Sequence, residues 1–158
     1  MKAAEVTDAV IDEMRQREYD VVRINYANGD MVGHTGDLRA AILAVEAVDL
    51  SLGRLLKEVD RQDGIAIITA DHGNADQMFE IDKKTGEFQV DDDGHLKRKT
   101  SHTLNPVFCI FHERGERSLE LVDALENPGL ANVAASILTI LGFEPPEGYE
   151  PSLVKRKG

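Results

Sequence analysis

A short apolar run that ends directly in an acid and a histidine constrains this chain more than any other feature. Ile65 to Thr69 have the β-branched bias of a strand buried on both faces, and Asp71-His72-Gly73-Asn74 follows almost at once. In open α/β sheets the ligand crevice lies beyond the carboxyl ends of the strands, where Asp71 and His72 would stand. The same four residues are also good turn formers, because Asp and Asn bond their own backbone and Gly accepts a positive φ. Taken alone, the stretch leaves a ligand site and a plain turn both open.

Helical and strand-like segments alternate along the chain. Apolar spacing predicts helices at 1–17, 38–61, 119–125 and 130–141, and apolar runs predict strands at 19–26, 65–69 and 106–111. The long helix should start after a capping Asp37 and bury a stripe that includes Ile42 and Leu55. This alternation predicts an α/β fold with a mostly parallel sheet. Because three strands make a thin sheet, we expect another segment of the polypeptide or a partner to complete it.

The periodic pattern disappears between residues 75 and 103. Lys83-Lys84-Thr85-Gly86 separates two short apolar stretches and predicts a small hairpin, and Asp91-Asp92-Asp93-Gly94 predicts a second turn. The acidic triplet resembles a calcium loop only faintly, because an EF-hand needs further oxygens at fixed positions. We therefore interpret 75–103 as a surface excursion with a hairpin, within a single domain over 1–158.

Charge and cysteine content exclude several classes of function. With 29 acidic and 18 basic residues the net charge is −11, which argues against a nucleic-acid surface and against docking on anionic lipid. No apolar stretch approaches the length of a membrane span. Cys109 is the only cysteine, so an internal disulfide is impossible and a reducing compartment is expected.

Metal-ligating residue types collect at the predicted crevice loops. They are Asp30, His34, Asp71, His72 and His102. An Asp-x-x-x-His pair puts both side chains on one face of a helix, and a third ligand from His102 would leave coordination positions open for substrate. Two cations held by this set suit in-line displacement at phosphorus, and they would supply the positive field that an acidic chain lacks. The competing hypothesis is a catalytically silent α/β module in which these residues only fix turns.

Three stretches carry a resemblance to a known family. They are Asn28 to Gly36 (NGDMVGHTG), Thr69 to Asn74 (TADHGN) and Thr100 to Val107 (TSHTLNPV). In this order they resemble the metal-binding motifs of cofactor-independent phosphoglycerate mutase, a family of the alkaline phosphatase superfamily. The resemblance implies a three-layer αβα, alkaline-phosphatase-like fold, present here only in part.

The resemblance also implies a ligand set and an activity. Asp30, His34 and His102 would hold one metal, and Asp71 and His72 would hold the other. The metal is usually Mn²⁺, with Mg²⁺, Co²⁺ or Zn²⁺ as alternatives. The family interconverts 3-phosphoglycerate and 2-phosphoglycerate through a phosphoserine intermediate, as a glycolytic step in the cytoplasm.

The family's pattern is not complete in these residues. Its serine nucleophile, a further Asp and an inserted substrate-binding domain would all stand upstream of Met1, so we interpret the chain as the C-terminal portion of the phosphatase-like domain. We expect it to be inactive alone and open to self-association through an uncovered sheet edge. A phosphatase, sulfatase or phosphopentomutase of the same superfamily is the alternative parent.

Overall fold

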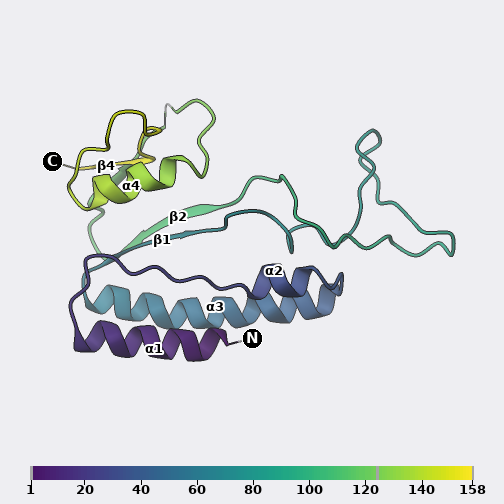
Figure 1. Cartoon of the computed structure of the whole chain (residues 1–158), viewed down its shortest axis with the longest axis horizontal. Coiled ribbons are helices and arrows are strands. Elements are labelled where there is room, and N and C mark those ends of the chain that lie inside the picture. The colour runs from purple at the N-terminus through teal and green to yellow at the C-terminus, as the bar shows by residue number, and fades with distance from the viewer. Residues whose placement is uncertain (1, 124, 158) are drawn as a thin grey trace.

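The computed structural model describes residues 2–123 and 125–157 as a mixture of helices and strands. The elements, in chain order, are α1 Ala3–Gln16, α2 Asn28–Gly33, α3 Leu38–Arg61, β1 Ile65–Thr69, β2 Cys109–Glu113, β3 Leu119–Leu121, α4 Asn132–Ile140 and β4 Val154–Arg156. Helices α1 to α3 lie on one side of the β1–β2 pair, and α4 lies on the other side with β3 and β4 (Figure 1). The predicted α/β class is confirmed.

Helices α1 and α3 form where the periodicity predicts them, although Met1, the first residue of the first prediction, lies outside the described residues. The Asp37 carboxylate accepts a hydrogen bond from the backbone N–H of Ala40 at 3.0 Å. This bond satisfies one of the free donors of the first turn of α3, as the capping prediction requires. No helix in the described part of the chain is long and apolar enough to cross a membrane.

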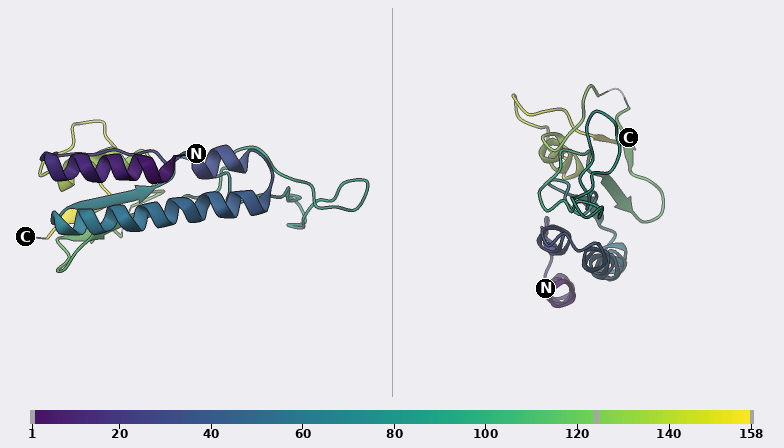
Figure 2. Two further views of the ribbon diagram at one scale, coloured as in Figure 1. Left: turned by 90° about the horizontal axis from the view of Figure 1, so that it is seen from below. Right: turned by 90° about the vertical axis from the view of Figure 1, so that its right-hand side faces the viewer.

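The two long helices, α1 and α3, run side by side (Figure 2), and they pack through a small apolar cluster. Ile11 of α1 meets Leu55 and Val59 of α3, and all three are less than a tenth exposed. The predicted stripe is right at Leu55 but wrong at Ile42, which is 48% exposed. The neighbouring helices cover only one face of α3, and Ile42 lies outside that face.

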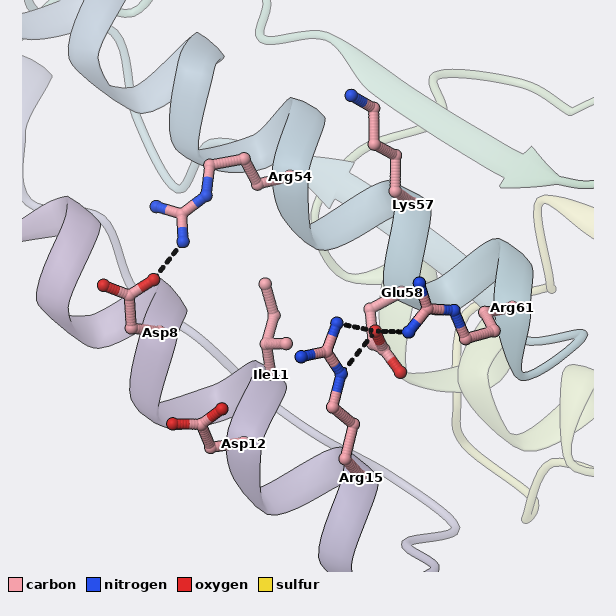
Figure 3. A pocket seen from close by; sticks show the side chains of 8 residues that line it. All are labelled: Asp8, Ile11, Asp12, Arg15, Arg54, Lys57, Glu58 and Arg61. Carbon is pink, nitrogen blue, oxygen red and sulfur yellow. Dashed lines mark hydrogen bonds and ion pairs between the residues drawn. The ribbon is translucent and has the colours of Figure 1, made fainter.

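A groove of about 460 Å³ between α1 and α3 is lined mainly by charged side chains (Figure 3). Glu58, whose side chain is 3% exposed, accepts hydrogen bonds from Arg15 Nε at 2.9 Å and from Arg61 at 3.2 Å. The hydrogen bond from Arg15 lowers the pKa of Glu58 below its ordinary value, against the opposing effect of burial. Both arginines bond Glu58 Oε2, and Gln62 Nε2 donates to Oε1 at 3.2 Å, so both carboxylate oxygens have partners and the Arg15–Glu58 pair links α1 to α3.

Strands β1 and β2 pair in antiparallel register, from Ile65 opposite Glu113 to Thr69 opposite Cys109. The second pair, β3 with β4, is antiparallel as well. The prediction of parallel pairing is therefore wrong for the described strands. The chain returns from β1 to β2 through an irregular excursion, and antiparallel strands need no helical crossover. The strand predicted at 106–111 begins only at Cys109, because its partner strand β1 ends at Thr69, which lies opposite Cys109.

The segment after β2 corrects a further prediction. The helix predicted at 119–125 is wrong, because Leu119–Leu121 is strand β3; Ala124 lies outside the described residues. Its Leu-Glu-Leu alternation fits a strand, and Val154 of β4, a strand that contacts both β3 and α4, is 1% exposed. The helix predicted at 130–141 is confirmed as α4, and Gly142, at φ +86°, ends it.

The strand predicted at 19–26 does not form in the described residues. The segment runs without helix or strand pairing between α1 and α2 (Figure 1). The Tyr26 hydroxyl hydrogen-bonds Thr7 Oγ1 at 2.7 Å, and Ile24 packs against the Ile11 cluster. The apolar pattern therefore marked a packed segment correctly, but a strand also needs a neighbouring edge, and no described segment supplies one.

Residues 75–103 extend away from the layers as an irregular arm (Figure 1). Isolated antiparallel bridges join Ile81 to Phe88 and Val90 to Leu96. Asp82 caps the first turn through hydrogen bonds from the N–H groups of Lys84 and Thr85, at 2.7 and 3.1 Å. The two ends of the arm lie together beside His72 and His102, because Gly73 and Thr103 form a bridge at its base.

Candidate metal centre

Helix α2 brings Asp30 and His34 together. Asp30 lies within the helix and His34 follows its last residue, and the His34 N–H still donates to the Asp30 carbonyl oxygen at 3.1 Å. Side chains four residues apart share a helix face. His34 Nε2 accordingly lies 3.2 Å from Asp30 Oδ1.

His102 reaches the same carboxylate from the far end of the arm. Its Nε2 lies 3.0 Å from Asp30 Oδ1 and 3.2 Å from His34 Nε2. Tetrahedral coordination with bonds of about 2.0–2.1 Å requires ligand atoms roughly 3.3 Å apart, so the triangle of donor atoms has nearly the required size. The three side chains are 33% to 49% exposed, which leaves the open side of the triangle accessible. The donor set fits a divalent cation.

The protonation of His34 also fits a cation. Its Nδ1 lies 2.7 Å from the carbonyl oxygen of Thr100. Because a carbonyl oxygen only accepts, Nδ1 carries the hydrogen, and in the neutral ring the Nε2 lone pair faces Asp30. Metal-ligating histidines are held in this way, with the second nitrogen donating to the protein.

His72 and Asp71 lie beside the triangle but differ in orientation. The ring of His72 stacks on that of His102, with centroids 3.7 Å apart and planes at 17°. His72 Nε2 is 3.9 Å from Asp30 Oδ1 and 3.6 Å from Asp71 Oδ1. The Asp71 side chain is 90% exposed and points to solvent. The structure therefore brings the three predicted histidines around the Asp30 carboxylate and leaves Asp71 at the rim.

Asn74 belongs to this centre although its residue type suggested only a turn. Its Nδ2 donates to Asp30 Oδ1 at 2.9 Å, and the residue is 5% exposed. Burial raises the pKa of Asp30, but the Asn74 hydrogen bond and the nearby imidazoles outweigh it, so the pKa is lowered from its ordinary value. A Cβ on Gly33 would overlap Asn74 Oδ1, so glycine at 33 permits this approach. The sequence signal was the placement of Asn74 and Gly33 inside two ligand motifs.

A second group of metal-ligating types, Asp91, Asp93 and His95, lies in the turn between Val90 and Leu96 of the arm. All three are exposed, and Asp91 Oδ1 accepts hydrogen bonds from the backbone N–H groups of Asp93 and His95 at 3.1 and 2.9 Å. The carboxylate caps its own turn. This arrangement agrees with a solvated turn.

Comparison with known proteins identifies the family. Residues 1–145 match the model of the metalloenzyme superfamily. The chain belongs to the metalloenzyme superfamily. Among its relatives, the 2,3-bisphosphoglycerate-independent phosphoglycerate mutase of Trypanosoma brucei brucei is 49% identical over 156 residues, which are 98% of this chain and 28% of that protein. A probable enzyme of the same name from Leptospira interrogans is 47% identical over 157 residues, 99% of this chain and 28% of that protein.

A solved structure agrees with this metalloenzyme fold. Leishmania mexicana phosphoglycerate mutase, crystallised at low cobalt concentration, matches with a TM-score of 0.93 and 48% identity, over 99% of this chain and 29% of that one. The resemblance drawn from the three motifs is thereby confirmed, and so is the fold class. The chain spans little more than a quarter of the length of these relatives.

Proposed function

We propose that Asp30, His34 and His102 bind one divalent cation, and that Asp71 and His72 contribute to a second. The triangle of donor atoms, with sides of 3.0 to 3.2 Å, is the observation that carries the proposal. When bound, two such cations supply charge stabilisation to a phosphoryl group and to the attacking oxygen. The residues of this chain supply the ligand atoms and keep them in place. Asn74 holds Asp30, and the Thr100 carbonyl oxygen holds His34, each through a hydrogen bond.

Mn²⁺ is our proposal for the native cation, with Mg²⁺, Co²⁺ and Zn²⁺ as alternatives. Imidazole nitrogens with a carboxylate oxygen form a borderline donor set that suits Mn²⁺, Co²⁺ and Zn²⁺. The crystals of the Leishmania mexicana enzyme at low cobalt concentration support Co²⁺ as an experimental probe.

For the whole protein we propose interconversion of 3-phosphoglycerate and 2-phosphoglycerate through a phosphoserine, in the cytoplasm, as a glycolytic isomerase. Residues 1–158 would be the C-terminal portion of its phosphatase-like domain, with 75–103 as a surface excursion. The names of the Trypanosoma and Leptospira relatives support this activity. The nucleophilic serine and the substrate-binding domain would belong to the remainder, so the 158 residues alone are predicted to be inactive.

Exposed apolar side chains support a missing neighbour. Leu50 of α3 is 72% exposed, and Phe108 and Ile110, just before and within β2, are 57% and 50% exposed. Apolar faces of this kind favour burial against another segment or a second copy. We propose that the remainder of the polypeptide covers them, and that the isolated chain self-associates. Sedimentation should give a concentration-dependent mass, and a monomer at all concentrations would contradict this.

Turnover of 3-phosphoglycerate is the test of the activity. The Mn²⁺-loaded chain should convert none, and the full-length protein that contains it should produce 2-phosphoglycerate. Turnover by the 158 residues alone would contradict the assignment of the nucleophile. Hydrolysis of phosphate or sulfate esters by the full-length protein, without mutase activity, would favour the alternative enzymes of the superfamily.

A further inference from the structure

The three candidate ligands are held in two different ways. Asp30 Oδ1 and His34 Nδ1 each make a hydrogen bond to the surrounding chain, at 2.9 and 2.7 Å. Within residues 2–123 and 125–157, the structure shows no such bond to Nδ1 of His102. Apart from the contacts that its Nε2 makes with Asp30 and His34, the placement of His102 therefore depends on its own backbone and on the ring of His72 stacked against it.

Asp76 holds the backbone next to His102. Thr103 donates its hydroxyl to the Asp76 carboxylate, 3.3 Å from Oδ1 and 3.1 Å from Oδ2, and Asn105 Nδ2 donates to Oδ2 at 2.6 Å. The N–H of Thr103 also donates to the Gly73 carbonyl oxygen at 2.8 Å. These bonds join the loop that follows β1 to the segment that carries His102.

The contact between these two segments is as close as the backbone allows. A Cβ on Gly73 would overlap Thr103 Oγ1 and would lie 2.6 Å from Asp76 Oδ1. Only glycine fits at 73 without displacing the hydroxyl or the carboxylate. Because His72 and His102 are the immediate neighbours of Gly73 and Thr103, this approach also sets the stacking of the two rings.

We infer that Asp76 is a positioning residue of the metal centre: through Thr103, its carboxylate holds the His102 imidazole where it and Asp30 bind the same cation. The inference rests on the proposed metal site. The donor atoms that cluster are those of Asp30, His34 and His102, and Asp76 is not among them, so we assign Asp76 a role through Thr103, to which both of its oxygens are hydrogen-bonded.

Co²⁺ binding to three variants of the chain tests this role, by calorimetry and by the visible absorption of bound Co²⁺. Asp76→Ala should weaken binding about tenfold and change the absorption spectrum, since loss of a partner that orients a ligand costs about 10- to 100-fold in affinity. Asp76→Asn should bind as the wild type does, because an amide oxygen at the Oδ2 position accepts from both Thr103 and Asn105. Asp82→Ala, which removes a loop carboxylate of equal charge from the arm, is the matched control and should change nothing.

Two results would overturn the inference. Unchanged Co²⁺ binding in Asp76→Ala would show that Thr103 needs no carboxylate, and equal loss in Asp76→Asn would show that charge matters and hydrogen bonding does not. The ring ¹H resonances of His72 and His102 in metal-free protein give an independent readout. Their stacking shifts should disappear in Asp76→Ala and persist in Asp76→Asn. If the wild type binds no Co²⁺, the proposed function fails, whereas these resonances still decide the role of Asp76.

Discussion

Glu58 and Asp30 are two carboxylates in one helical layer. The pKa of each is lowered, but their hydrogen-bonding partners differ. Glu58 is buried to 3% exposure and faces guanidinium groups, which carry a permanent charge and have no lone pair to offer. Asp30 is 33% exposed and faces imidazole nitrogens within 3.0 to 3.9 Å. A lowered pKa alone does not distinguish an ion pair from a metal site. The chemistry of the partners does, because imidazoles can turn a lone pair toward a shared cation.

The largest expected difference between the two carboxylates is in metal affinity. Asp30→Ala removes the oxygen that both His34 Nε2 and His102 Nε2 face, so Co²⁺ affinity should fall by more than about a hundredfold, beyond the usual cost of losing a ligand's partner. Glu58→Gln should leave the affinity unchanged. Calorimetric titration of both variants measures this. Equal losses of Co²⁺ affinity in the two variants would contradict the assignment of Asp30, and not Glu58, as a metal ligand.

A smaller effect is expected from the glycine that lets Asn74 reach Asp30. In Gly33→Ala the new Cβ overlaps Asn74 Oδ1, so Asn74 must move and Co²⁺ affinity should fall about tenfold. Gly53→Ala in α3 is the control, because nothing lies within 4 Å of its Cβ. Titration with Co²⁺ should show weaker binding in Gly33→Ala than in Gly53→Ala. An unchanged affinity in Gly33→Ala would show that Asn74 does not support the metal site.

The acid sensitivity of the fold should depend on Glu58. Its pKa is lower in the folded chain than the ordinary value of 4.5, so its contribution to stability is present above that value and is lost as the pH falls through the folded pKa. Urea unfolding should show that wild type is more stable than Glu58→Gln near neutrality, and that the difference shrinks below about pH 5. Parallel pH curves for the two proteins would contradict the assignment.

The smallest effect is expected at the rim. Asp71 is 90% exposed, so Asp71→Ala should weaken the first Co²⁺ ion by less than about fivefold, the size of a screened surface interaction. The chain should accordingly bind one cation tightly. A loss as large as that of Asp30→Ala would place Asp71 in the first site.

Local patterns predicted the elements whose determinants are local. Helix α3 begins after the Asp37 cap, and its first and last residues agree with the prediction because the cap and the apolar spacing both lie within 37–61. The 19–26 and 119–125 segments were misjudged because strand formation depends on a partner edge, which lies far away in sequence. The antiparallel return of β2 depends likewise on the path of the arm.

The candidate site was predictable in residue types but not in detail. The motifs predicted that Asp30, His34 and His102 meet, and their donor atoms lie within 4.8 Å of one another, although Asp30 lies in helix α2 and the strand predicted before it does not form. The roles of Asn74 and Asp76 were not predictable, because each acts on a segment more than 25 residues away through side-chain hydrogen bonds. No periodicity encodes such contacts.

Diffraction from crystals of the chain grown with Co²⁺, recorded at the cobalt absorption edge, locates the proposed cation directly. We expect an anomalous peak about 2.0–2.2 Å from each of Asp30 Oδ1, His34 Nε2 and His102 Nε2. A map with no peak in this triangle, or with its strongest peak at Asp91, Asp93 and His95, would contradict the proposed metal site.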